Sequence, residues 1–257
     1  MNFNEIKQKI NQSEGISFGY IFGETLEFFQ ATWVQGLLCM VFLIIAVFAI
    51  EMLVMFPISF FFGVMQFTSP NDFSDISLLT ILLMVFVAVT FFSLIMTIST
   101  SLIGGLFIIY KKIDHDEQHS TNDFFYLMKK QNFAKTFQIG LAQVVLMLAF
   151  YLMCCLPIIY AVVPISYIVV VYAFNPDLTI TEIVKLSFAI GNKNWIEKFL
   201  LRMVLGILAT ILGLLLCGVG LLATFSIAII PQYLIYKQMI GFEDTSEIDL
   251  IGTDDSN

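Results

Sequence analysis

Charged residues are scarce in this sequence, since Asp, Glu, Lys and Arg together make up 12% of its 257 residues. Soluble proteins carry about 25%, so these side chains are too few to cover a water-soluble globule of this length. Hydrophobic residues make up 59% of the chain, and its mean hydropathy is +0.91. Several apolar runs exceed the roughly 18 residues that predict a membrane-spanning helix. The composition therefore predicts an integral membrane protein.

Basic residues are fewer than acidic ones, with 12 Lys and Arg against 20 Asp and Glu. They form no continuous basic stripe, which excludes nucleic acid as an expected partner. The segment 242–257 contains acidic residues and no basic residue, so most of the net charge of −8 belongs to this end. We expect residues 242–257 to form an acidic disordered tail, which is solvated or recruits a cytosolic partner.

Cysteine and histidine are also rare, with four and two residues respectively. The cysteines lie in apolar runs without metal-binding spacing, so we expect small buried side chains. His115 and His119 have the spacing of two helical zinc ligands, with Asp116 between them. Their surroundings are a charged linker with no third ligand. We therefore expect a solvated loop, and we assign no metal, cofactor or catalytic residue; a zinc site is the least favoured alternative.

What the chain does contain is three apolar blocks, at residues 33–110, 137–174 and 199–236. Basic residues flank each block, and the positive-inside rule places every flank in the cytoplasm. A block that begins and ends on one side crosses an even number of times. Residues 137–174 as one helix would be about 57 Å long, against a hydrocarbon core of roughly 30 Å, so two crossings are favoured. One long tilted helix is the alternative.

This pattern predicts six transmembrane helices, at about 33–56, 78–103, 137–154, 157–174, 197–216 and 219–237, with both termini cytoplasmic. Amphipathic lead-ins precede the three pairs, at about 16–30, 123–131 and 179–190. The second and third blocks align at a period of 62 residues, which favours a repeated unit. The expected fold is an all-α membrane protein of three helical hairpins, each preceded by an amphipathic interfacial helix, in a single membrane domain over residues 1–241.

Local signals refine the expected boundaries. Ser120-x-x-Asp123 and Thr179-x-x-Glu182 resemble capping boxes at helix starts. Pro57 is predicted to end the first span. The run 78–110 is too long for one perpendicular crossing, so it tilts, projects from the membrane, or bends at Gly104 and Gly105.

Three polar residues in the predicted spans are candidate functional residues. Glu51 lies about 27 Å beyond Trp33, so it is an interfacial carboxylate or an ion-handling group. Arg202 reaches about 10 Å into its span, where it extends to the interface or contacts a lipid phosphate or a substrate. Gln143 ties helices together or lines a path.

Three stretches carry a resemblance to known proteins: Asn175-Pro176-Asp177, Gly191-Asn192-Lys193-Asn194-Trp195 and Gly218-Val219-Gly220. They resemble a broad family of uncharacterised bacterial multi-pass membrane proteins, and are similar to the membrane domain that accompanies some glycerophosphodiester phosphodiesterases. The resemblance implies a six-helix domain in the inner membrane and no catalytic residues. The soluble phosphodiesterase domain is absent from this sequence, so no enzyme activity is expected.

We therefore expect a non-catalytic scaffold or interaction protein of the inner (plasma) membrane. Its expected partners are membrane lipids and a cytosolic or membrane protein. The alternative is a small transporter or lipid-handling permease. A polar cavity at mid-membrane between the repeats would favour transport, whereas a closed, Phe- and Leu-packed centre counts against it.

Overall fold

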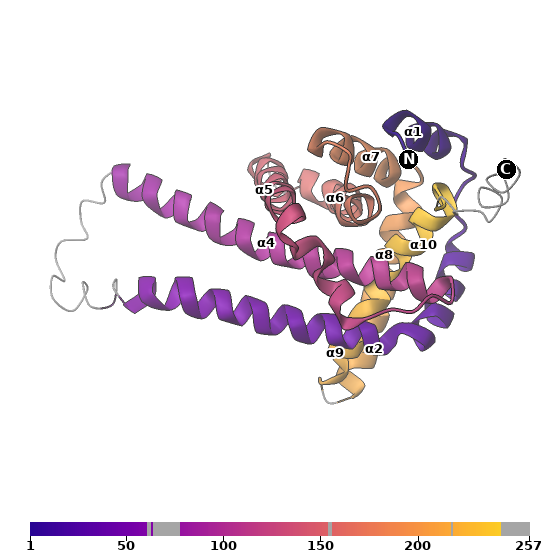
Figure 1. Ribbon diagram of the computed structural model, residues 1–257, viewed down its shortest axis with the longest axis horizontal. Helices are drawn as coiled ribbons and strands as arrows, with labels where there is room; N and C mark the ends of the chain where they lie inside the picture. Colours follow the sequence, from indigo (N-terminus) through magenta and orange to yellow (C-terminus); the bar gives the residue numbers. More distant parts are fainter. Residues whose placement is uncertain (61–62, 64–77, 154–155, 217, 243–257) are drawn as a thin grey trace, which may run out of the picture.

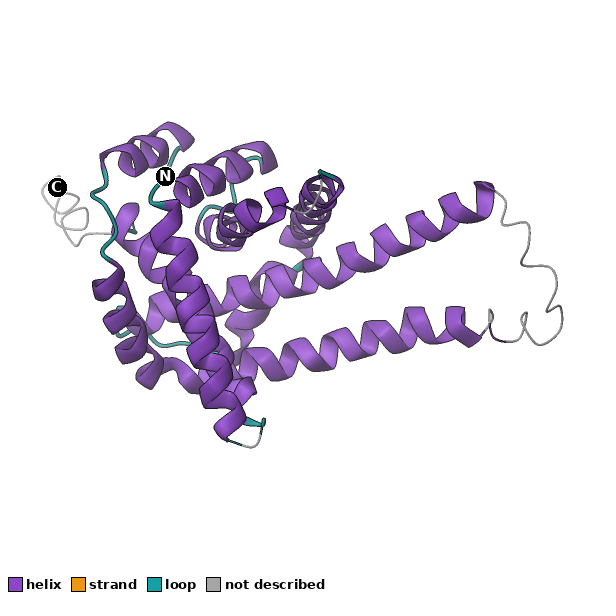
Figure 2. Ribbon diagram, turned by 180° about the vertical axis from the view of Figure 1, so that it is seen from behind, coloured by secondary structure: helices purple, strands orange, loops and turns teal. Residues whose placement is uncertain are grey.

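The computed structural model describes residues 1–60, 63, 78–153, 156–216 and 218–242. Throughout these ranges the secondary structure is helical, without a strand (Figures 1 and 2). Six helices are long and apolar enough to cross a membrane. The predicted all-α class and the six membrane-length helices are therefore confirmed. The connection between the first two predicted spans, residues 57–77, and the acidic tail lie largely outside the described residues.

The helices follow one another in the order that the apolar blocks predict. The first pair is α2 (Phe18–Ile50) and α4 (Leu78–Asp114), preceded by α1 (Phe3–Gln12). The second is α5 (Lys130–Leu152) and α6 (Leu156–Phe174), preceded by the 3-10 helix η3 (Thr121–Met128). The third begins with α7 (Ile180–Asn192) and α8 (Trp195–Leu215) and returns through α9 (Gly220–Thr224), η4 (Phe225–Ala228) and α10 (Ile230–Met239).

The three pairs diverge from a shared core. In Figure 1, α2 and α4 extend across the page, α8 runs down it, and α5 and α6 are seen close to end-on. The core contains the first half of α2, the second half of α4, and most of α6 and α10; Tyr110, Tyr172 and Tyr233 are fully buried there. The chain is therefore not a bundle of six parallel helices, and one flat bilayer cannot lie perpendicular to all three pairs in this arrangement.

Pro57 does not end the first span, contrary to expectation. The helix that starts at Phe18 continues to Phe60, passing through the π-helical turn η1 (Glu51–Met55). In this turn the Phe56 amide donates to the carbonyl of Glu51, five residues earlier. A proline ring clashes with the carbonyl four residues before it in a regular helix, and a π-bulge is one of the recognised local distortions associated with such a site. The π-helical turn therefore accommodates Pro57 within a continuing helix.

Gly104 and Gly105 do not bend α4, which is one helix from Leu78 to Asp114, longer than the predicted span 78–103. Instead they form the surface on which η3 packs. A Cβ atom on Gly105 would lie 2.4 Å from the carbonyl oxygen of Phe124, and one on Gly104 would lie 2.5 Å from Leu127 Cδ1. The glycine pair is required by this close approach.

The predicted capping boxes are confirmed. Ser120 and Asp123 close one at the start of η3, and Thr179 and Glu182 close the other at the start of α7. The hydrogen bonds from the Thr179 hydroxyl and backbone amide to Glu182 lower the pKa of this carboxyl. These bonds satisfy amide groups that a helix start otherwise leaves without a partner.

The amphipathic lead-ins differ in form from the expectation. Residues 18–30 are the beginning of α2 rather than a separate helix, because no break separates them from the span. The second lead-in is the 3-10 helix η3, not an α-helix over 123–131. The third, α7, is a regular helix that packs lengthwise against α6: a Cβ on Gly191 would lie 2.4 Å from Pro164 Cα.

The α6–α7 packing brings together two residues that the predicted topology separates. The Trp195 indole N–H donates to the Tyr160 carbonyl at 3.0 Å, and the two rings stack at 6.1 Å. Tyr160 lies near the start of α6, which the predicted hairpin places at the outer surface, whereas Trp195 was expected at the cytoplasmic interface. The start of α6 and the start of α8 therefore share one level of the molecule.

Phe242 was assigned to the disordered tail, and the structure corrects this. Its ring lies 4.8 Å from that of Phe174 and 5.7 Å from that of Tyr233, and the ammonium of Lys111 lies 4.8 Å from its centroid. The membrane domain therefore extends by at least one residue beyond Gly241, because an aromatic side chain gains from burial against other rings.

Candidate functional site

The three candidate residues lie on different helices and do not form one site. Glu51 is exposed at the π-helical turn of α2, beyond the packed part of that helix. Gln143 is buried on α5, and Arg202 is exposed on α8. Each therefore has to be considered in its own surroundings.

Gln143 joins α5 to α4. Its amide oxygen accepts a hydrogen bond of 2.8 Å from the Thr100 hydroxyl. The two helices approach closely one turn away, where a Cβ on Gly140 would lie 2.8 Å from the Thr97 amide nitrogen. Small residues at a close contact and a polar bond across it are the usual means by which membrane helices associate. Gln143 therefore has the geometry of a helix tie, one of the two roles expected for it.

Three lysines hold helix C-termini, a role that the sequence alone did not assign. Lys193 donates to the carbonyls of Ile10 and Ser13 at the end of α1, at 2.5 and 2.6 Å. Lys198 is buried on α8 and donates to the carbonyls of Ile190 and Lys193 at the end of α7. Lys9 donates to the Ile240 carbonyl after α10, at 3.0 Å.

These bonds are favourable because the last carbonyls of a helix lack intrahelical partners and carry partial negative charge. The positive-inside pattern identified the lysines as a group, but their receiving carbonyls lie far along the chain or in another element. No local signal could have matched Lys193 or Lys9 to its helix end, since each partner lies about 180 residues or more away.

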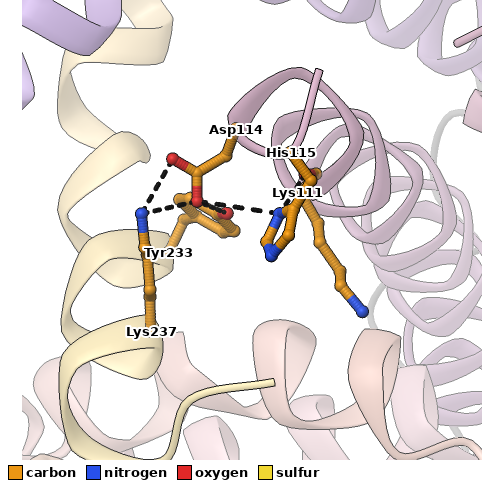
Figure 3. A network of polar contacts seen from close by, with 5 residues as sticks. All are labelled: Lys111, Asp114, His115, Tyr233 and Lys237. Carbon is orange, nitrogen blue, oxygen red and sulfur yellow. Dashed lines mark hydrogen bonds and ion pairs between the residues drawn. The ribbon is translucent and has the colours of Figure 1, made fainter. Parts of the chain in front are cut away.

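A second polar network joins α4 to α10 (Figure 3). The Asp114 carboxylate accepts a hydrogen bond of 2.8 Å from the Tyr233 hydroxyl and pairs with Lys237 at 2.6 Å. The ring of His115 lies 4.0 Å from the same carboxylate, and its Nδ1 donates to the Lys111 carbonyl at 2.8 Å. Asp114 is thus bonded on both oxygens, which suits a structural pair rather than an acid or base waiting for a substrate.

The histidines do not have the geometry of a zinc motif. α4 ends at Asp114, so His115 and His119 do not share a helical face. The His119 ring instead lies 3.3 Å from the Gln35 amide. Among the described residues, no group of three or more His, Cys, Asp and Glu side chains is placed to hold a metal ion.

Arg202 opens onto a groove between α6 and α8. The groove has a volume of about 540 Å³, and Gly206 and Thr210 lie along it. Its apolar lining consists of Val162, Phe199, Met203, Ile207 and Ile211. The Thr210 hydroxyl donates to the Gly206 carbonyl at 2.8 Å, so it presents no free donor to the groove. Apart from Val162 of α6, these residues all lie on α8, so the arrangement is a shallow, open groove along one face of α8 with Arg202 near its N-terminal end.

The polar neighbour of Arg202 is an uncharged amide. When the Gln232 amide is oriented so that its nitrogen donates to the Ser166 carbonyl, its oxygen accepts from Arg202 Nη1 at 3.2 Å. No carboxylate of the described chain forms an ion pair with Arg202. The guanidinium therefore keeps donors for another ligand.

Comparisons with protein-family models, with curated proteins and with solved structures found no match.

Proposed function

We propose that this chain is a non-catalytic scaffold of a membrane, which binds a membrane-protein partner through the arm formed by residues 44–60 and 78–90. This α2–α4 arm extends away from the packed core (Figure 1). None of its described residues is buried, and Phe48, Leu53, Leu79 and Phe86 are among its exposed apolar side chains. A contiguous apolar surface of this extent is covered by lipid or by another protein.

Several polar side chains are already used in bonds between helices, which supports a binding role over a catalytic one. Asp114, Gln143, Lys193 and Lys198 all make bonds that hold helices together. Catalysis needs a group that is positioned but still free to transfer a proton or attack a substrate. A scaffold requires only the rigid core that these bonds provide.

The test is to place a photo-crosslinking amino acid at Phe48 or Phe86 in cells, with the same substitution at Leu214 as control. Leu214 is a similarly exposed residue on α8. We expect one protein adduct of constant mass from both arm positions and none from Leu214. Lipid adducts alone from all three positions would contradict the scaffold role.

We further propose a multi-pass arrangement of helical hairpins in a bacterial inner membrane, with both termini cytoplasmic. The support is the gathering of lysines at helix ends around the core, the positive-inside rule, and the resemblance to bacterial multi-pass membrane proteins. Single cysteines at positions 129 and 193, in a chain whose native cysteines are replaced by serine, test this orientation. We expect both to be labelled from the cytoplasmic side; labelling from opposite sides would contradict the topology.

The labelling at position 193 also tests whether α6 crosses the membrane. Tyr160, near its start, contacts Trp195, so labelling of position 193 from the cytoplasmic side would place the start of α6 near that side as well and would exclude a full crossing by α6. The second candidate function, a lipid-handling permease, is favoured by the groove at Arg202, which joins a cation to an apolar face of α8.

A further inference from the structure

The groove between α6 and α8 combines features that match one kind of molecule. Arg202 lies at one end and apolar side chains line the remainder. A bare cation within a membrane-spanning helix is unfavourable unless it reaches water, another charge or a polar group. A ligand that brings an anion to Arg202 and a hydrocarbon chain to the groove satisfies both parts of the site.

The dimensions fit one leaflet of a bilayer. From Arg202 to Ile211 the groove follows nine residues of α8, or about 14 Å along the helix axis, and half of a hydrocarbon core is roughly 15 Å. Trp195, an aromatic residue typical of the interface, opens the same helix. Arg202 lies about 10 Å beyond Trp195 along α8, so its long side chain extends toward the headgroup level and can hold a phosphate there while the groove receives the chain.

Gly206 keeps the groove open. A Cβ atom built at this position meets nothing within 4 Å, whereas one at Gly213 on the same helix would lie 2.5 Å from Leu221. Close helix packing therefore explains Gly213 but does not explain Gly206. A side chain at position 206 would occupy the groove without displacing a neighbouring helix.

We propose that the α6–α8 groove is a binding site for an anionic phospholipid, with the phosphate held by Arg202 and one acyl chain lying along Met203, Gly206 and Ile207. Arginine suits this role because its planar guanidinium donates two parallel hydrogen bonds to a phosphate. The site does not depend on the scaffold role of the α2–α4 arm, and it is the first requirement of the lipid-handling candidate.

The test measures lipid retained by the purified full-length protein, by native mass spectrometry after exchange into detergent containing phosphatidylglycerol or phosphatidylcholine. We expect wild-type protein to retain one phosphatidylglycerol in preference to phosphatidylcholine. Arg202→Gln removes the charge and is expected to weaken this retention at least about tenfold. Gly206→Leu fills the groove and is expected to produce a similar loss.

Two controls separate the site from general lipid contact. Gly23→Leu adds the same side chain at another exposed position where a Cβ meets nothing within 4 Å, and Lys130→Gln removes an exposed cation elsewhere; both are expected to retain lipid as wild type does. Glycerol phosphate at millimolar concentration is not expected to displace the lipid, because it lacks the acyl chain; full displacement would mean that the headgroup alone is recognised and would overturn the assignment of the groove.

Equal retention of the two lipids, or unchanged retention by Arg202→Gln or Gly206→Leu, would overturn the proposal. Thermal unfolding of each variant confirms that it is folded, and a folded variant is required for the comparison. Since lipid is counted on purified protein, this result is independent of whether the arm crosslinks to a partner.

Discussion

Lys193 and Ser13 are joined across 180 positions of the chain, with the lysine ammonium 2.6 Å from the serine carbonyl oxygen and 3.0 Å from its hydroxyl. The same ammonium reaches the carbonyl of Ile10. One side chain, directly after the end of α7, thus holds the C-terminus of α1 in place against α7.

Removing this lysine is expected to release α1. In Lys193→Met the end of α1 loses its charged donor, and a hydrogen bond to a charged group contributes about 1.5–3 kcal/mol. Amide hydrogen exchange in residues 3–12 should therefore accelerate by roughly tenfold or more. Lys185→Met, which removes an exposed lysine of α7, should leave α1 protected. Unchanged exchange in Lys193→Met would show that apolar packing of Ile6 and Ile10 holds α1 unaided.

Gly105→Ala is expected to destabilise the fold by about 1–3 kcal/mol, the usual cost of forcing extra volume into a packed contact. The new Cβ would lie 2.4 Å from the Phe124 carbonyl, a backbone atom that cannot rotate away. Gly23→Ala serves as the matched control, because it has open space and alanine favours a helix by about 1 kcal/mol over glycine. Thermal unfolding in detergent should therefore shift downward for Gly105→Ala and slightly upward for Gly23→Ala. A shift in the same direction for both would contradict the role of Gly105 as the contact surface for η3.

Thr100→Val tests the bond between α4 and α5. The substitution keeps the shape of the side chain but removes the donor to Gln143. Polar bonds between membrane helices average about 0.6 kcal/mol and reach about 1.7, so a modest loss of stability is expected. A double-mutant cycle with Gln143→Leu isolates the pair. Additive effects of the two substitutions would show that the bond contributes nothing of its own.

Stability is expected to fall in acid through Asp123. Partial burial raises the pKa of this carboxyl, but hydrogen bonds from the Ser120 amide and the Lys112 ammonium, together with the Lys112 charge, outweigh burial, and the net pKa lies below its usual value. Because the folded pKa is depressed, the stabilisation is present above the unfolded value of about 3.9 and is lost as the pH falls through the folded pKa.

The corresponding measurement compares unfolding of wild type and Asp123→Asn between pH 3 and pH 7. The variant should be less stable near neutral pH, and the gap between the two proteins should narrow toward the acid end. A gap that stays constant over this range would exclude Asp123 as the titrating group. The Thr179 box at α7 provides a comparison, since the pKa of Glu182 is also lowered.

The sequence by itself determined the features that depend on neighbouring residues. Hydropathy over about 20 residues identified six helices of membrane length, because a lipid environment requires a minimum apolar run. The boxes at Ser120 and Thr179 were also predicted correctly, because a capping side chain bonds an amide only three positions away. Helix boundaries were less accurate. The expected helix end at Pro57 was wrong, because a π-helical turn just before the proline allows the helix to continue.

Only the tertiary structure decided which distant groups meet. A bend at Gly104 and Gly105 was one of three alternatives for the long run 78–110, but Gly105 is the contact surface for η3, since that requirement comes from the Phe124 backbone and not from α4. The lysines were identified as cytoplasmic flanks, yet the carbonyls that Lys193 and Lys9 bind belong to helices at opposite ends of the chain. Likewise, only the tertiary structure places Val162 of α6 beside the apolar face of α8 that Arg202 shares. Hydrogen bonds and steric contacts act over a few ångströms of space, so a one-dimensional pattern does not contain them.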